Sequence, residues 1–331
     1  MDDLPKISVI IPTYGEDVYI EKKILNTQSQ YPLEKIQIIV VCSEPSINTL
    51  KALNAFKQQD LITLIIEPSR SGKANAINLA LKKSSEDICV ITDNDSILED
   101  DALLHLINAL TEGIGAVSAK VIYNDKSQSN LLNALVFNRF KSGLKDLESK
   151  VDSCSYAPGE LLAFRRSLVE NLPQNSVCDD YYILLKVISK GYRCISEPKA
   201  VVYEAPPSTI KGKIKRTRRV TSGTLLEASI FKNMLFNKKY GFFGILIFPS
   251  YLIRIILLPL LFFSFSALLL LTLFDLSASF PFRWPLFIIG FFSILMWRQV
   301  LYVTTLLASM FLGFIDYLTG NNSPIWDDCK S

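Results

Sequence analysis

Histidine and paired cysteines are scarce in this chain. Its 331 residues include one histidine, His105, and six cysteines, none of them in a C-x-x-C pair. Structural zinc sites and disulfide frameworks need clustered or regularly spaced cysteine and histidine residues. We therefore expect neither a zinc site nor a disulfide scaffold, and we interpret His105 as an ordinary helix residue.

A strong net charge and a glycine-rich phosphate loop are also missing. The formal net charge is +3, which gives no indication of a nucleic-acid partner. The first predicted strand ends in PTYGE, with a single glycine, whereas a phosphate-binding loop usually needs several glycines so that backbone N–H groups can surround the phosphate. A membrane nucleotidyltransferase is therefore only a weaker alternative.

Long apolar runs are present, and they are confined to the carboxyl-terminal third. Hydrophobic residues make up 49% of the chain, and Ile255 to Phe274 contains no charge. A helix needs about 20 apolar residues to cross a bilayer, so this segment predicts a membrane span. A second region, Trp284 to Tyr317, is broken by Arg298 and predicts one further span from Gln299 to Ile315. Two spans are favoured, and three are the alternative.

The flanking segments predict how the chain meets the membrane. Tyr240 to Ile253 is aromatic, apolar and broken by Pro249, which is typical of a helix lying in the interface. A basic run, Lys211 to Arg219, precedes the first span, and the positive-inside rule then keeps residues 1–250 in the cytoplasm. The acidic start MDDLP leads directly into a strand, so no signal peptide is expected. The expected organisation is a cytoplasmic domain (1–230), an interfacial segment (231–254), spans in the cell membrane (255–319) and a cytoplasmic tail (320–331).

Strand and helix patterns alternate through the first part of the chain. Short β-branched runs are separated by helical stretches, which predicts an α/β fold with a mostly parallel sheet and right-handed crossovers. The predicted strands are Ile7–Pro12, Ile36–Val41, Leu61–Ile66, Ile88–Thr92 and Gly115–Tyr123, and the predicted helices are Val18–Gln30, Ser46–Gln58, Lys73–Lys83 and Asn130–Ser149.

The most informative stretch is DICVITDND, Asp87 to Asp95. A buried parallel strand that ends in two aspartates one residue apart places both carboxylates in the crevice where such sheets bind ligands. Mg²⁺ takes one or two carboxylates and completes its coordination with water and phosphate oxygens, so the pattern indicates a metal that carries a diphosphate. The plain alternative is that these residues cap a helix from Ser96 to Leu110.

Six segments in order carry a family resemblance. They are ISVIIPTYGE, SRSGKANAIN, TDND, PGELLAFRRSL, CDDYYILLKVISKGYR and a basic R-x-x-R run ahead of the carboxyl-terminal helices. The set resembles the family-two inverting glycosyltransferases with a GT-A fold. Within them it looks closest to the membrane-embedded synthase-like branch, which includes polysaccharide synthases and single-transfer lipid glycosyltransferases. The resemblance covers about residues 5–320.

The resemblance implies a donor site at the ends of the first strands. Pro12, Tyr14 and Glu16 match the residues that hold the base and ribose, and Lys73 matches the G-K-A-x-N lysine that reaches the diphosphate. The plain alternatives are a strand-ending turn and a solvated lysine at a helix start. The expected donor-site residues are Pro12, Tyr14, Glu16, Ser43, Lys73, Asp93 and Arg216, with Asp93 and Asp95 on a Mg²⁺ or Mn²⁺ ion.

The resemblance also implies the catalytic residues. Asp180, preceded by Asp179, matches the second acid of the family's E-D pair, the general base that takes the proton of the acceptor hydroxyl. The plain alternative is that acidic residues in a first helical turn favour the helix dipole. Arg219 resembles the arginine of Q-x-x-R-W, and Gly159 with Glu160 matches the acceptor segment.

Two departures from the family pattern affect the expected substrate. The Q-x-x-R-W tryptophan is replaced by Val220, which disfavours processive synthesis. The second strand ends in Cys42-Ser43-Glu44-Pro45 instead of base-contacting acids, so the base stays open between uracil, guanine and others. The sequence therefore favours transfer of a single sugar from a nucleotide sugar to a lipid-linked or other membrane acceptor. A processive synthase or an inactive GT-A binding subunit is the alternative.

Overall fold

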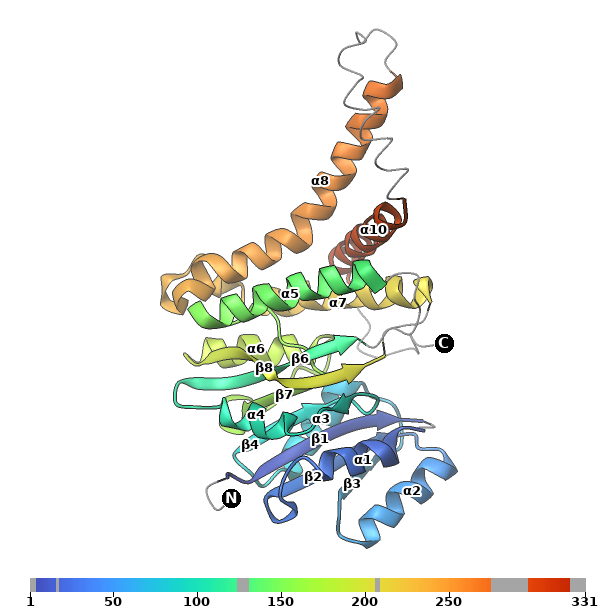
Figure 1. Cartoon of the computed structure of the whole chain (residues 1–331), viewed down its shortest axis with the longest axis vertical. Helices are drawn as coiled ribbons and strands as arrows, with labels where there is room; N and C mark the ends of the chain where they lie inside the picture. Colours follow the sequence, from blue (N-terminus) through green and yellow to red (C-terminus); the bar gives the residue numbers. More distant parts are fainter. Residues whose placement is uncertain (1–3, 16–17, 124–130, 206–208, 275–296, 322–331) are drawn as a thin grey trace.

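The protein is described by a computed structural model that covers residues 4–15, 18–123, 131–205, 209–274 and 297–321 (Figure 1). It contains an eight-stranded sheet in the order β3-β2-β1-β4-β7-β6-β8-β5. Strand β7 runs antiparallel between β4 and β6, and β5 pairs antiparallel with β8. The strands are β1 (Ile7–Tyr14), β2 (Ile36–Ser43), β3 (Thr63–Glu67), β4 (Ile88–Thr92), β5 (Ile97–Leu98), β6 (Ile114–Tyr123), β7 (Leu161–Arg165) and β8 (Arg193–Glu204).

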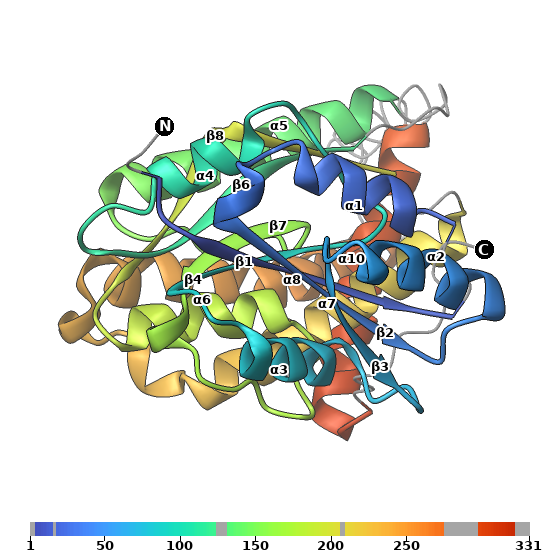
Figure 2. The ribbon, with the colours of Figure 1, turned by 90° about the horizontal axis from the view of Figure 1, so that it is seen from below.

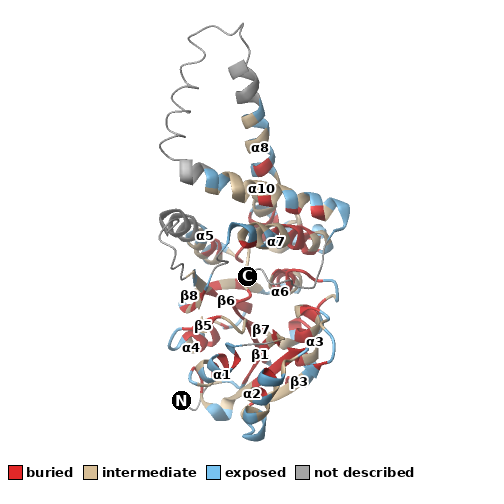
Figure 3. Cartoon of the chain, turned by 90° about the vertical axis from the view of Figure 1, so that its right-hand side faces the viewer, coloured by how far each residue is buried: buried red, intermediate tan, exposed pale blue. Residues whose placement is uncertain are grey.

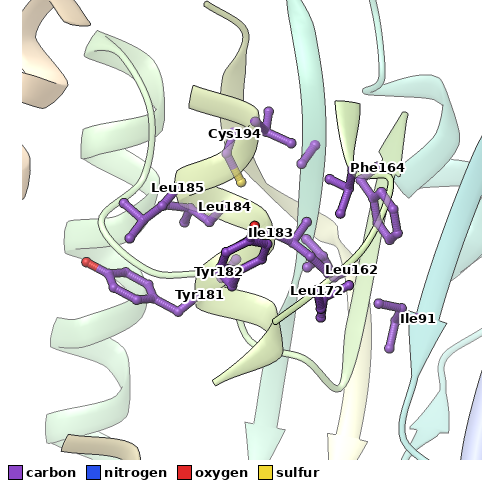
Figure 4. Close-up of a cluster of buried hydrophobic side chains, with 14 of the residues drawn as sticks. Ile91, Leu162, Phe164, Leu172, Tyr181, Tyr182, Ile183, Leu184, Leu185 and Cys194 are labelled. Carbon is purple, nitrogen blue, oxygen red and sulfur yellow. The ribbon is translucent and has the colours of Figure 1, made fainter. Parts of the chain in front are cut away.

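Helices cover both faces of this sheet, and the alternation of side chains along each strand divides the core in two. In β1, Val9 and Ile11 point into a core shared with α1, α2 and α4, whereas Ile10 belongs to a core shared with α3 and α6. Figure 2 shows the two groups of helices on opposite sides of the strands, and Figure 4 shows part of the second core. The helices of these two layers are α1 (Ile20–Gln28), α2 (Ile47–Gln58), α3 (Lys73–Lys83), α4 (Ala102–Asn108) and α6 (Asp179–Ser189).

The α/β prediction is confirmed, and the strand Ile88–Thr92 and the helix Lys73–Lys83 have the predicted bounds. The predicted helix from Ser96 to Leu110 is wrong in its first turns. Ile97 and Leu98 are extended because they pair with Tyr203 and Val202 of β8, and the helix begins only at Ala102. The aspartates after β4 therefore do not cap that helix, which removes the plain reading of this motif.

Four further helices lie on one side of the sheet domain, at the top of Figure 1. Helices α5 (Leu131–Val151) and α7 (Ile210–Ile230) lie between the sheet and α8 (Phe248–Phe274), which extends away from the domain. Helix α10 (Trp297–Thr319) lies along α7 (Figure 3). A Cβ atom at Gly313 would lie 2.4 Å from the Arg218 carbonyl oxygen, and Arg218 forms an ion pair with Asp316. Helix α10 is therefore packed directly onto the backbone of α7.

Among the residues that the structure describes, two helices are long and apolar enough to cross a membrane, Phe243–Ala267 and Leu301–Thr319. The predicted break at Pro249 is absent, because a π-helical turn, Phe243–Ile247, leads directly into α8. Pro249 follows this π-helical turn by one residue, within the continuous helix. The predicted interfacial segment and the first predicted span thus form continuous helix, and the alternative third span lies largely outside the described residues.

Short 3₁₀ turns complete the described secondary structure. They span Leu33–Lys35, Arg166–Leu168, Lys232–Met234 and Lys238–Tyr240.

Candidate active site

Strands β1, β2 and β4 are parallel neighbours, so their carboxyl ends lie along one edge of the sheet. Tyr14 ends β1, and the Arg70 guanidinium lies 3.7 Å from the centre of its ring. Pro12 lies two residues earlier in the same strand. Ser43 ends β2 and donates a 2.6 Å hydrogen bond to Glu67. Glu16 lies outside the described residues.

Glu67 is a residue that sequence reasoning missed. It is buried at the end of β3, where it accepts hydrogen bonds from Ser43 (2.6 Å) and from the Asn75 amide (2.5 Å). The second strand lacks the acids usual at its end, and the structure brings a carboxylate to that place from β3. A lone glutamate that closes an apolar strand was the available signal.

Lys73 opens α3 and lies between two carboxylates of the predicted site. Its Nζ atom is 2.8 Å from Asp93 Oδ1 and 3.3 Å from Asp179 Oδ2. Burial would lower the pKa of Lys73, but the charges of Asp179, Asp93 and Asp180 outweigh it and raise this pKa above its ordinary value. Lys73 is therefore a permanent cation at the carboxyl end of β4.

The turn that carries Asp93, Asn94 and Asp95 is held by hydrogen bonds on both sides. The Asn94 amide donates to Thr13 of β1 (3.3 Å), and the Ser96 hydroxyl donates to the Asp93 carbonyl oxygen (2.8 Å). These contacts fix the backbone from which both carboxylates project.

Lys23 of α1 anchors this turn from below and was also missed. Its buried Nζ atom donates to Thr92 Oγ1 (2.7 Å), the Ser96 carbonyl oxygen (2.9 Å) and Ser96 Oγ (3.0 Å). Burial lowers the pKa of Lys23 to about 7, although the charge of Asp93 raises it. Three donated bonds require the protonated ammonium, so Lys23 ties together the two residues that flank the aspartates.

Asp180 begins α6 beside Lys73 and Gly159. Burial, followed by the charge of Asp179, raises the pKa of Asp180 to about 7, while Lys73 opposes the shift. A Cβ atom at Gly159 would lie 3.3 Å from both Asp180 Oδ2 and Lys73 Nζ, so a larger residue would crowd these two side chains. A carboxylate with this pKa can accept a proton at neutral pH.

Arg216 of α7 is held between Glu160 and Glu204. Its guanidinium lies 2.9 Å from Glu160 Oε1 and 3.0 Å from Glu204 Oε1. Burial and then the charge of Glu160 raise the pKa of Glu204, while the charge of Arg216 opposes the shift. The buried cluster joins α7 to the Gly159–Glu160 segment.

A cavity of about 190 Å³ connects these groups. Most of the predicted site residues line it: Lys73, Asp93, Gly159, Glu160, Asp179, Asp180, Arg216 and Arg219. The cavity is also lined by Tyr156, Tyr181, Val220 and, from α8, Tyr251. Pro12, Tyr14, Ser43 and Asp95 are not among the lining residues and lie along the neighbouring strand ends and turn.

Asp93 and Asp95 suit a divalent cation that takes only one or two of its ligands from the protein. The described residues contain no cluster of three or more Cys, His, Asp or Glu side chains able to hold a metal. Carboxylate oxygens are the donors that Mg²⁺ and Mn²⁺ prefer, and Mg²⁺ is usually bound by one or two of them together with substrate phosphates. The fixed turn and the adjacent cation Lys73 suit a metal that arrives with a diphosphate.

The sequence profile of Glycosyl transferase family 2 matches residues 8–172, a stretch that includes β1 to β7, Lys73 and the aspartate turn. The chain belongs to this family. It has a GT-A fold followed by apolar carboxyl-terminal helices, as the sequence predicted.

The chain is also similar to two curated relatives and to one solved structure. Probable glycosyltransferase YdaM of Bacillus subtilis (strain 168) is 27% identical over 272 residues, covering 75% of this chain and 64% of that protein. Poly-beta-1,6-N-acetyl-D-glucosamine synthase of Staphylococcus aureus (strain COL) is 26% identical over 230 residues, covering 67% and 55%. The chain thus spans less than two thirds of either relative.

The solved structure is similar over nearly the whole chain. Mannosyltransferase PcManGT from Pyrobaculum calidifontis, in complex with GDP-Man and Mn²⁺, has a TM-score of 0.79 at 28% identity, covering 96% of this chain and 88% of that one. The likeness includes the region beyond the family match, where α7, α8 and α10 lie.

Proposed function

We propose that this glycosyltransferase moves a single sugar from a nucleotide-sugar donor to a lipid-linked or other membrane acceptor at the cytoplasmic face, with inversion and with a divalent cation. The observation that carries the proposal is Asp180: a carboxylate with a pKa of about 7 that lines the cavity beside Lys73 and Asp93.

The donor would bind along the strand ends. Its base and ribose would lie near Pro12, Tyr14, Glu16 and Ser43, and its diphosphate near Lys73. Asp93 and Asp95 would hold a Mg²⁺ or Mn²⁺ ion, which supplies electrostatic stabilisation of the leaving diphosphate when it is bound. PcManGT was solved with GDP-Man and Mn²⁺, which makes GDP-mannose the first donor to test.

Asp180 would perform the proton transfer. It accepts the proton of an acceptor hydroxyl while that oxygen attacks the anomeric carbon and the bond to the diphosphate breaks. Lys73 stabilises the negative charge that develops on the leaving group. Asp179 keeps Lys73 in place and raises the pKa of Asp180, and Arg219 lines the same cavity.

A membrane acceptor is supported by the origin of one cavity wall. Tyr251 lines the cavity and belongs to α8, one of the two helices able to cross a membrane. An acceptor anchored in lipid would therefore reach the cavity beside α8, without crossing the sheet domain.

A processive polysaccharide synthase is the second candidate. The staphylococcal relative is a polymer synthase, and Tyr156 and Tyr251 give the cavity aromatic faces although Val220 replaces the family tryptophan. Single transfer is favoured because two apolar helices cannot enclose a polar conduit for a polymer without oligomerising.

The test is transfer of label into lipid. The purified protein would first be screened by thermal shift with nucleotide sugars and Mn²⁺, because a ligand of the native state raises its stability. The best donor, in radiolabelled form, would then be incubated with the protein and a membrane lipid extract. We expect an organic-soluble product that carries one sugar, lost in Asp95→Ala and retained in Asp100→Ala, an exposed control between β5 and α4. A ladder of water-soluble products would support the synthase, and metal-independent transfer would remove the metal site.

A further inference from the structure

Helix α5 presents two lysines to the cavity. Lys141 and Lys145 are four residues apart and therefore share one face of the helix. Their Nζ atoms lie 4.2 Å and 5.5 Å from the centre of the same ring, that of Tyr156. Both lysines line the cavity.

Lys145 is a buried lysine without a carboxylate partner, and burial lowers its pKa. Its residue is 2% exposed, and its Nζ atom donates to the Ala119 carbonyl oxygen (2.9 Å) and Ser118 Oγ (3.3 Å). Within the described chain neither this atom nor Lys141 Nζ has a carboxylate oxygen within 4.0 Å. Taking a charge out of water without an opposite partner costs several kcal/mol. An anion bound beside the two lysines would offset this cost and favour their protonated forms, so this part of the cavity suits an anion.

Two other cations of the cavity, Lys73 and Arg216, are used differently. Lys73 is paired with Asp93 and Asp179, and Arg216 with Glu160 and Glu204. The two lysines of α5 therefore differ from these cations in having charge available for a ligand that the protein itself does not supply.

Two tyrosine rings and an ion pair surround the subsite formed by Lys141 and Lys145. Tyr156 and Tyr251 are nearly parallel, with ring centres 6.4 Å apart and planes at 14°. Arg254, one turn beyond Tyr251, pairs with Glu148 of α5 at 3.3 Å. The subsite thus lies where α5 meets the first turns of α8, at the end of the cavity nearest the apolar helices.

We propose that Lys141 and Lys145 bind a phosphate group of the acceptor, so that the acceptor is a phosphate-bearing molecule whose hydroxyl is presented to Asp180. This inference rests on the proposed function and names its acceptor class. A phosphate supplies the negative charge and the multiple acceptor oxygens that two ammonium groups can satisfy together. The donor diphosphate binds at Lys73 and the aspartate turn, so the two phosphate sites are separate.

Two matched variants test the lysines. Lys141→Met and Lys145→Met remove the charges at similar length, and Lys145→Met should fold because replacing a buried charge by an apolar side chain is often neutral or stabilising. Lys141 is on the exposed part of the helix, so its variant carries the test if the other fails to fold. Lys150→Met, an exposed lysine of the same helix outside the cavity, is the control.

The probes are farnesyl phosphate and glucose 6-phosphate, each compared with its uncharged counterpart, farnesol or glucose, by calorimetry on the detergent-solubilised full chain. We expect at least one phosphate to bind, at least 10-fold more weakly to either lysine variant and unchanged to Lys150→Met. If the lysine variants lose binding of farnesyl phosphate alone, the acceptor is a lipid phosphate. If they lose binding of glucose 6-phosphate alone, the acceptor is a soluble sugar phosphate. Loss of both shows that the phosphate alone is recognised.

Unchanged phosphate binding in both lysine variants would overturn the proposal, as would phosphates that bind no better than farnesol and glucose. A parallel titration with nucleoside diphosphate and Mn²⁺ separates this failure from that of the proposed function. Donor binding should be equal in the wild type and in all three variants, and its absence in the wild type would contradict the proposed function instead.

Discussion

At the scale of single residues, the charge state of Asp180 decides both chemistry and stability. Its folded pKa of about 7 lies above the ordinary aspartate value near 3.9. A raised acid pKa means that its contribution to stability is present below the unfolded pKa and is lost as pH rises through 7. The ligand-free protein therefore carries a destabilising carboxylate at neutral pH, in a place where a proton acceptor is needed.

Asp180→Asn should separate these two effects. The amide cannot accept the proton, so transfer should fall by about 100-fold or more, while calorimetric binding of nucleoside diphosphate with Mn²⁺ stays near the wild-type value. At pH 8 the ligand-free variant should have a higher Tm than the wild type, because the buried charge is gone. Near-normal turnover would move the base to another group, first of all Asp179.

The pH profile should report the same group. Because the unprotonated form is active, kcat/KM should fall about tenfold per unit as pH drops below about 7 and should level off above it. The measurement is initial rate at low acceptor concentration between pH 5 and pH 9. A rate that stays flat down to pH 5 would contradict an Asp180 with a raised pKa.

Lys23→Met should weaken the metal site without touching it. The variant loses the three hydrogen bonds that join Thr92 to Ser96, so the aspartates between them lose their fixed geometry, and removing a supporting contact of this kind typically lowers metal affinity 10–100-fold. We expect Mn²⁺-dependent nucleotide binding to fall about tenfold at an unchanged metal-free affinity. Lys22→Met, the exposed neighbour, should bind as the wild type does, and equal affinities in the two variants would refute this role.

At the scale of elements, the contact between α7 and the start of α6 depends on one glycine. A Cβ atom at Gly223 would lie 2.7 Å from Cys178 Sγ and 2.9 Å from Val177 Cβ, directly before Asp179. Glycine is otherwise unfavourable in a helix interior, so its presence here indicates a need for close approach.

Gly223→Ala should therefore lower both Tm and transfer, although alanine is the better helix former by about 1 kcal/mol. The matched control is Gly143→Ala in α5, where an added Cβ meets nothing within 4 Å and the Tm should rise. Thermal unfolding and transfer assays of the two variants provide the comparison. A rise in Tm at both positions would show that α7 can move aside freely.

Elements with a strong local pattern were predictable from the sequence. The strand before the aspartates and the helix opened by Lys73 follow from an apolar run and from helical periodicity, and the structure has them at the predicted bounds. The first turns of the predicted helix at Ser96 failed because Ile97 and Leu98 pair with β8, more than a hundred residues later, and no local pattern contains that pairing.

The residues of the candidate site likewise include some that the sequence predicted and some that it did not. The residues that end or open an element, such as Lys73, Asp93 and Asp180, were found because motif and position coincide. Lys23, Glu67 and Lys145 were missed because each acts through partners distant in the sequence and looks like an ordinary surface residue in its own segment. Their common signal is burial of a charged side chain, which only the fold reveals.

At the scale of the whole molecule, the apolar helices are joined to the candidate site. Helix α8 contributes Tyr251 to the cavity, and α10 packs on α7 at Gly313 and through the ion pair of Arg218 with Asp316. Helix α7 in turn carries Arg216 and Arg219. A sheet domain without these helices would lack one wall of the cavity, which fits an enzyme whose acceptor comes from the membrane.

The proposed reaction is a single displacement in which one carboxylate, Asp180, takes the acceptor proton opposite the departing diphosphate. It is tested by the anomeric configuration of the first transfer product, determined by proton NMR after brief incubation with an α-linked nucleotide sugar. We expect a β-linked product, formed by the wild type and not by Asp180→Asn. An α-linked product would contradict it, because retention requires a different mechanism from the one that a single base provides.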